Sequence, residues 1–231
     1  MQAAAREYTS KEDRLDTLIL NAGIMATPPG LTTEGYEIQF GTNHVGHALL
    51  TKLLLPTLLK TAEQPVADVR VILLSSMGHL MAPGAGIVFK DLKTDMRSYL
   101  TLKRYAQSKL ANILFAKELD RCYNSKGITA VAVHPGLVNT ELYRTIFSGY
   151  FGLGELLDKA KGLFYTSVQD GVKNQLWAAV GRKGDNSGEV KGGEYYMPVG
   201  ISGQGSNISG DSELAEKLWE WTEKELEGWI L

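Results

Sequence analysis

The stretch VRVILLS, residues 69–75, is an apolar run with the length of one β-strand, and it ends in a polar serine. Such runs are typical of strands that are buried on both faces of a parallel sheet. Two similar stretches lie on either side of it along the chain, LDTLILN at 15–21 and ITAVAVH at 128–134. A fourth strand is predicted at GEYYMPV, residues 193–199.

Helical patterns alternate with these strands, at about 34–62, 98–125 and 167–181. Each is long enough to connect two parallel strands as a crossover helix. A last helix is predicted at 211–228, because Asp211 is a suitable N-cap and apolar residues follow on one face, namely Leu214, Leu218, Trp221 and Leu226. The alternation predicts a single α/β domain over residues 1–231, with a doubly wound parallel sheet between two helix layers.

Composition excludes several classes of function. The 231 residues carry 24 Lys and Arg against 26 Asp and Glu, a net charge of -2, and no basic cluster recurs along a helix, so a nucleic-acid partner is not expected. The single cysteine, Cys122, cannot form an internal disulfide. Residues 1–14 lack the apolar core of a signal peptide, and no apolar run has the length of a membrane span. We therefore expect a soluble, cytoplasmic protein.

Polar or small residues follow each predicted strand. They are Asn21-Ala22-Gly23, Ser75-Ser76, His134-Pro135-Gly136 and Gly200. Ligands of open parallel sheets bind beyond the carboxyl ends of the strands, so these residues should meet along one rim. The helix that follows the serines contains Tyr105 and Lys109, which should approach the same rim.

Tyr105 and Lys109 are four positions apart, about one helical turn, so both side chains project from one face of the helix. A free tyrosine titrates at about pH 10, too high for acid–base chemistry at neutral pH. A nearby ammonium group favours the phenolate and lowers that pKa. Together with Ser76, this pair predicts a site for proton transfer to and from a substrate oxygen. The alternative is a packed tyrosine beside a solvated lysine.

Five motifs occur in the order found in the short-chain dehydrogenases and reductases: NAG at 21–23, TNHVGH at 42–47, LLSSMGH at 73–79, YAQSKLAN at 105–112 and HPGLVNT at 134–140. From about residue 15 onward the chain resembles this family, and within it the branch of retinol dehydrogenases and WW-domain-containing oxidoreductases. The resemblance implies a Rossmann-like fold, an NAD or NADP cofactor, and oxidation of an alcohol or reduction of a carbonyl. It also implies a homo-oligomer, a dimer or tetramer that pairs through the helices at about 34–62 and 98–125.

The resemblance implies roles for individual residues. Tyr105 donates or accepts the proton, Ser76 holds the substrate oxygen, Lys109 lowers the tyrosine pKa and binds the nicotinamide ribose, and Asn43 holds a water beside Lys109. The cofactor is further expected to contact Asn21, Ala22, Gly23, Pro135, Gly136, Val138 and Thr140.

One motif of that family is not in this sequence, the glycine-rich turn TGxxxGxG that holds the pyrophosphate. The stretch at 15–21 resembles the family's fourth strand, so we expect a truncated dinucleotide-binding half and weak binding of NAD(P). The glycine-containing segment 200–210 could replace the turn, but its sixth fingerprint position is Ile208. A flexible polar connection is the preferred interpretation of that segment.

Two further features have competing interpretations. His44 and His47 could share a metal, but no third and fourth ligand follow at a recognisable spacing, so no metal is expected. The aromatic segment 143–165 could touch a membrane or form an apolar lid, and the lid is favoured because it follows a strand end. An apolar lid indicates a hydrophobic substrate.

The sequence therefore predicts an NAD(P)-dependent oxidoreductase acting on a hydrophobic small molecule through Ser76, Tyr105, Lys109 and Asn43. Two alternatives stay open because the phosphate-binding turn is missing. The same residues could perform cofactor-independent proton chemistry, such as isomerisation or cyclisation, or the chain could be a non-catalytic binding partner.

Overall fold

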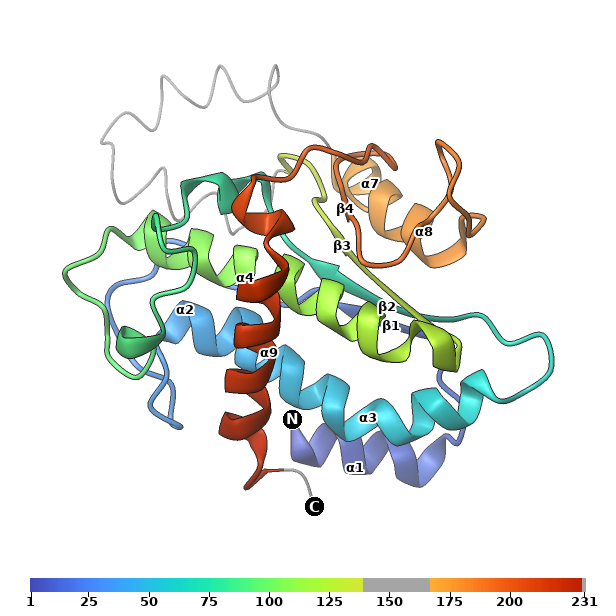
Figure 1. Ribbon diagram of the computed structural model, residues 1–231. Coiled ribbons are helices and arrows are strands. Elements are labelled where there is room, and N and C mark those ends of the chain that lie inside the picture. The colour runs from blue at the N-terminus through green and yellow to red at the C-terminus, as the bar shows by residue number, and fades with distance from the viewer. Residues whose placement is uncertain (139–166, 230–231) are drawn as a thin grey trace.

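A four-stranded parallel sheet forms the centre of the computed structural model, which describes residues 1–138 and 167–229 (Figure 1). The strands are β1 (Thr17–Leu20), β2 (Val69–Leu74), β3 (Ile128–Val133) and β4 (Tyr195–Tyr196), in the spatial order β1-β2-β3-β4. Thr17 aligns with Arg70, Val69 with Ile128, and Ala132 with Tyr195. The predicted parallel α/β sheet is confirmed, although the fourth strand has two residues where seven were predicted.

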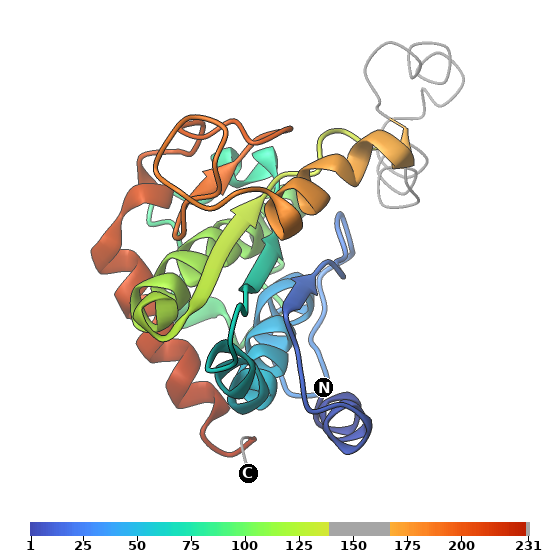
Figure 2. The same ribbon diagram turned by 90° about the vertical axis from the view of Figure 1, so that its right-hand side faces the viewer.

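Alternate residues of β2 and β3 face two different helix layers. Val71, Leu73 and Ala130 belong to a large core together with residues of the helices α3 (Gly46–Ala62) and α4 (Thr101–Tyr123). Ile72 and Val131 belong to a smaller core with the helix α8 (Lys173–Val180). Every residue of both strands is buried, which explains why their sequences are continuous apolar runs rather than alternating ones. Figure 2 shows the sheet between these layers.

The helix predicted at 34–62 begins at residue 38 and consists of three pieces: α2 (Ile38–Phe40), a π-helical segment η1 (Gly41–Val45), and α3. Glu37 caps its start, because the backbone N–H of Phe40 donates to the Glu37 carboxylate. A π turn holds one more residue than an α turn and shifts the side chains that follow. Here it includes Asn43.

The remaining helices agree with the predicted positions, with one exception. The pattern at 167–181 corresponds to α7 (Val168–Gly171) and α8, and the last helix is α9 (Ser212–Leu226). Asp211 caps α9, since its side chain accepts from the N–H of Leu214. The exception is α1 (Gln2–Lys11), which was not predicted and packs beside α3. Short 3-10 turns are η2 (Met77–Met81), η3 (Phe89–Asp91), η4 (Asn124–Lys126) and η5 (Ile208–Gly210).

Helix α9 lies across α3 and α4 on the side away from the sheet (Figure 1). Trp219 stacks on Phe115 with ring centroids 5.1 Å apart, and Glu223 forms an ion pair with Lys52 of α3 at 2.5 Å. Thr222 Oγ1 lies 3.2 Å from Nε2 of the buried His44. This helix therefore covers a face of the two helices through which pairing was predicted.

Within residues 1–138 and 167–229, no helix combines the length and the apolar character that crossing a membrane requires.

Candidate active site

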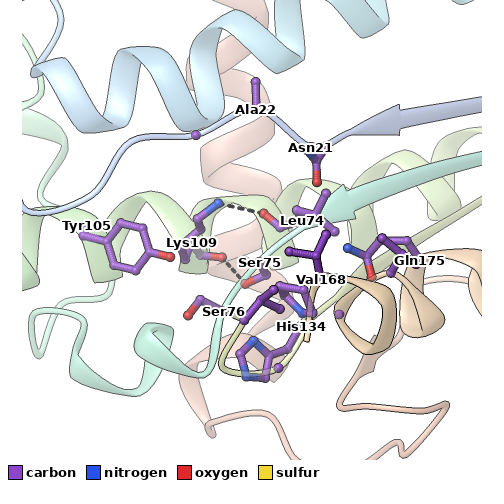
Figure 3. Close-up of a pocket in the computed structure, with 16 residues that line it drawn as sticks. Asn21, Ala22, Leu74, Ser75, Ser76, Tyr105, Lys109, His134, Val168 and Gln175 are labelled. Carbon is purple, nitrogen blue, oxygen red and sulfur yellow. Dashed lines mark hydrogen bonds between the residues drawn. The ribbon is translucent and has the colours of Figure 1, made fainter. Parts of the chain in front are cut away.

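A cavity of about 450 Å³ opens at the carboxyl ends of β1, β2 and β3, where the rim residues were expected to meet (Figure 3). Most of the predicted site residues line it, namely Asn21, Ala22, Gly23, Ser76, Tyr105, Lys109, Pro135, Gly136 and Val138. Asn43 lies outside the lining. Thr140 and the predicted lid at 143–165 fall outside the described residues.

Helix α4 supplies the central pair. Tyr105 and Lys109 are both buried, and Lys109 Nζ lies 5.7 Å from the centre of the Tyr105 ring. Figure 3 shows the phenol directed toward the lysine and Ser76. Lys109 Nζ donates to the carbonyl of Leu74 at 3.0 Å, which fixes the ammonium at the end of β2. Burial lowers the pKa of Lys109 to about 8, so the group still carries its charge at neutral pH.

The two serines after β2 have different partners. Ser75 donates its hydroxyl to the carbonyl of Lys109 at 2.7 Å and thereby ties β2 to α4. Ser76 is the N-cap of η2, and its Oγ accepts from the N–H of Gly78 at 3.0 Å. The Ser75 proton is already used in this bond, whereas the Ser76 oxygen is held as an acceptor. Ser76 is therefore the better placed donor to a ligand in the cavity.

Asn43 connects the loop after β1 to α4. Its Oδ1 accepts from the N–H of Ile24 at 2.8 Å, and its Nδ2 donates to the Ile24 carbonyl and to Ser108 Oγ, each at 2.9 Å. A Cβ on Gly23 would lie 3.2 Å from Asn43 Oδ1 and 3.4 Å from Lys109 Nζ. Glycine at position 23 thus leaves room between the Asn43 amide and the Lys109 ammonium.

The opposite wall comes from the segment after β3 and from α7 and α8. Gly136 has a positive φ of 90°, which a glycine adopts without strain. Gly171 packs so closely on Val138 that a Cβ would collide with that side chain. His134 was expected at this rim, and the lining residues that were not predicted are Leu74, Val168, Gly171, Val172 and Gln175. The spacing of 168, 171, 172 and 175 is that of one helical face, a signal present in the sequence.

The four histidines are all buried. In the cavity wall, burial lowers the pKa of His134 to about 4, so its imidazole is neutral at physiological pH. His44 packs between Phe40 and Phe115 inside the helix layer rather than facing outward. Among residues 1–138 and 167–229, no three acidic, histidine or cysteine side chains come together as a metal site would require.

The cavity fits the nicotinamide end of a dinucleotide. The lining combines the Lys109 ammonium and other polar side chains with the apolar Val138, Val168 and Val172; the other polar residues are Asn21, Ser76, His134 and Gln175. The missing Cβ of Gly23 opens the space beside Lys109 in which a ribose hydroxyl could sit. A flat aromatic ring carrying one polar group suits a cavity lined by both apolar and polar side chains.

Comparisons with known proteins identify the family of this chain. The family model described as short chain dehydrogenase matches residues 1–150. Similar relatives include short-chain dehydrogenase/reductase drtF of Aspergillus calidoustus, 39% identical over 97% of this chain and 72% of that protein. Retinol dehydrogenase 13 of Mus musculus is 35% identical over 93% of this chain and 61% of that protein.

A similar solved structure is that of NADPH-bound carbonyl reductase from chicken fatty liver, with a TM-score of 0.55 and 26% identity. The alignment covers 84% of this chain and 68% of that one. The chain spans between 61% and 72% of the length of the curated relatives it matches. With a family model matching most of its length and relatives above 30% identity, the chain belongs to the short-chain dehydrogenase family of oxidoreductases.

Proposed function

We propose that this chain interconverts an alcohol and a carbonyl on a hydrophobic small molecule, with NAD or NADP as the redox partner. The observation that carries the proposal is the convergence of Ser76, Tyr105 and Lys109 on one cavity at the carboxyl ends of the strands. The apolar lining residues Val138, Val168 and Val172 support a hydrophobic substrate.

In the direction of carbonyl reduction, Ser76 donates its hydroxyl proton as a hydrogen bond to the substrate oxygen. The nicotinamide, when bound, supplies the hydride to the carbonyl carbon. Tyr105 transfers its phenolic proton to the oxygen as negative charge develops there, and the charged Lys109 stabilises the phenolate that remains. Alcohol oxidation runs through the same positions in reverse, with Tyr105 as the base.

The strength of cofactor binding is a separate part of the proposal. A glycine-rich turn and the N-terminus of the following helix hold the pyrophosphate in dinucleotide sites, and the 231-residue sequence contains no TGxxxGxG turn. We expect this chain to bind NAD or NADP mainly through the nicotinamide end of the cofactor. Its dissociation constants for NADH and NADPH should therefore lie well above the low micromolar range.

The test combines a cofactor titration with turnover of the 231-residue chain. Calorimetric titration with NADH and NADPH measures binding, and a turnover assay uses retinoid and simple aromatic aldehydes at saturating cofactor. Tyr105→Phe should reduce turnover by at least about 100-fold, the usual effect of losing acid–base catalysis.

Tyr123→Phe is the matched control, since Tyr123 ends the same helix and lies outside the cavity lining. Turnover of Tyr105→Phe within a few fold of the parent would contradict the proposed role. Conversion of a substrate without any nicotinamide, lost in Tyr105→Phe, would favour cofactor-independent proton chemistry instead. Low micromolar binding would show that the turn is dispensable.

A further inference from the structure

His79 is the last residue of the motif LLSSMGH and follows Ser76 by three positions. It is not among the residues that line the cavity. It belongs to the 3-10 turn η2, and only 1% of the residue is exposed. The ring of Tyr195 from β4 packs edge-on against it, with centroids 5.0 Å apart and an interplanar angle of 72°. A buried imidazole at this position needs a partner for each of its nitrogens.

Both ring nitrogens of His79 have such a partner. Nδ1 lies 2.7 Å from the carbonyl oxygen of Ser76, and Nε2 lies 3.2 Å from the backbone N–H of Ser206. A carbonyl only accepts and a backbone N–H only donates, so Nδ1 carries the proton and Nε2 is the acceptor. Neither the other tautomer nor the imidazolium satisfies both bonds. Burial also lowers the pKa of His79, which favours the neutral ring.

We propose that His79 is a positioning residue: its Nδ1–H holds the Ser76 carbonyl, and its Nε2 ties the same turn to the segment 200–210. The proposal rests on the function proposed above, because Ser76 is the residue that receives the substrate oxygen. In this proposal the segment 200–210 stabilises the turn that carries Ser76, and it does not bind phosphate.

The packing of the turn makes its placement sensitive. The Ser76 carbonyl accepts from both the backbone N–H and the ring of His79, at 3.0 and 2.7 Å. On the other side of the turn, a Cβ on Gly78 would lie 3.1 Å from the Tyr105 ring and 3.3 Å from Ser76 Oγ. The turn is thus in close packing with Tyr105. A shift of a few tenths of an ångström would alter the position of the serine hydroxyl relative to the phenol.

Two amide substitutions separate the two hydrogen bonds. In His79→Asn the amide nitrogen takes the place of Nδ1 and keeps the bond to Ser76, whereas the bond to Ser206 is lost. In His79→Gln the amide oxygen takes the place of Nε2 and keeps the bond to Ser206 only. If the Ser76 bond positions the serine, turnover at saturating cofactor should fall about tenfold in His79→Gln and stay within about twofold in His79→Asn.

Two readouts do not depend on turnover. Long-range NMR of histidine-labelled protein should show His79 with its proton on Nδ1 at pH 7. Amide exchange at Gly78, whose N–H donates to Ser76 Oγ, should be about tenfold faster in His79→Gln than in His79→Asn. Equal exchange in the two variants, or a proton on Nε2, would overturn the proposal.

These outcomes are distinct from failure of the proposed function. A parent chain without turnover rejects the oxidoreductase proposal, while the tautomer and the Gly78 exchange still decide the role of His79. A purely structural histidine would lower the unfolding temperature equally in both variants without separating their Gly78 exchange or turnover, and that result would also overturn the inference.

Discussion

The charge of Lys109 is maintained despite its burial, and this decides what Tyr105 can do. Burial lowers the lysine pKa to about 8, but the Leu74 carbonyl accepts a hydrogen bond from the ammonium. At pH 7 the group is therefore mostly protonated, and it lies over one side of the Tyr105 ring. A positive charge at that place favours the phenolate form of the tyrosine, as acid–base catalysis near neutral pH requires.

Because of its buried histidines, we expect the free energy of unfolding of the protein to decrease as the pH is lowered. Burial lowers the pKa of His44 to about 3, and those of His47 and His134 to about 4, from 6.5. Between pH 6.5 and about 5, the unfolded chain binds protons at these positions and the folded chain does not. Stability is therefore present above 6.5 and is lost as the pH falls, by up to about 1.4 kcal/mol per pH unit for each histidine.

Urea unfolding at pH 7.5, 6.5, 5.5 and 5.0 measures this loss. The range ends above the usual titration of carboxylates, so histidines dominate it. In His47→Gln the slope of unfolding free energy against pH should be smaller by about one histidine's share. A slope equal to that of the parent would mean that His47 is not kept neutral in the folded chain.

A buried ion pair connects the loop after β1 to α4 at Arg104, the residue directly before Tyr105. Arg104 Nη1 lies 2.8 Å from Glu37 Oε1, with both side chains at most 1% exposed, and Arg104 Nη2 donates to the Thr27 carbonyl at 2.9 Å. Met25 and Ala26 of this loop pack against the Tyr105 ring. The ion pair thus positions the loop that forms one side of the tyrosine environment.

Removing one member of that pair should be costly. Arg104→Met leaves Glu37 with an uncompensated buried charge and should lower the free energy of unfolding by about 3–5 kcal/mol. The double variant Glu37→Gln/Arg104→Met removes both charges and should recover a large part of that loss. Urea unfolding of the parent, both single variants and the double variant gives the coupling energy. Additive effects of the two substitutions would show that the charges are not coupled.

An element could be predicted where its signal is local in the sequence. Strands β1, β2 and β3 and helices α4 and α9 carry local signals, because continuous apolar runs and the Asp211 cap do not depend on distant contacts. Helix α1 has no such signal: its only buried residue is Ala5, which packs through tertiary contact. Strand β4 is shorter than its pattern because only Tyr195 and Tyr196 align in register with β3, whereas Met197 pairs with Ile201 instead.

Site residues likewise differ in whether a local sequence signal indicates them. Tyr105, Lys109 and Ser76 were predictable because a helical repeat and a strand end place them. The role of Ser75 as a tie to α4 depends on a hydrogen bond between residues 34 positions apart. The partners of His79 come from Ser76 and from Ser206, 127 positions away. Contacts of this kind depend on the complete fold, so no spacing in the sequence indicates them.

At the scale of the whole molecule, one helix bears on the predicted oligomer. Helix α9 lies across α3 and α4, held there by the Trp219–Phe115 stack and the Glu223–Lys52 ion pair. A dimer formed through α3 and α4 would have to include the outer surface of α9 or displace it. The dimer or tetramer stays a prediction, and the open edge of the sheet offers another surface for association.

The last prediction concerns the outer edge of strand β1. Strand β1 ends the sheet and, within the described residues, pairs as a strand only with β2; the Ile19 carbonyl accepts from the N–H of Asn21 at 3.1 Å rather than from another strand. Ile19 in the middle of β1 is 40% exposed. Along α7 and α8, apolar residues are exposed at helical spacing, namely Val168, Val172, Leu176 and Val180. An apolar strand edge of this kind is a template for association.

We expect the purified chain to self-associate at high micromolar concentration, and Ile19→Lys to shift it toward the monomer, because a charged residue on an edge strand opposes strand pairing. Sedimentation velocity across a concentration series measures this. Val66→Lys is the control, since Val66 is fully exposed in the turn before β2 and belongs to no strand, so it should leave the association unchanged. A parent chain that stays monomeric over the whole series would show that the open edge is not an association surface. Equal dissociation by both substitutions would point to net charge rather than to the β1 edge.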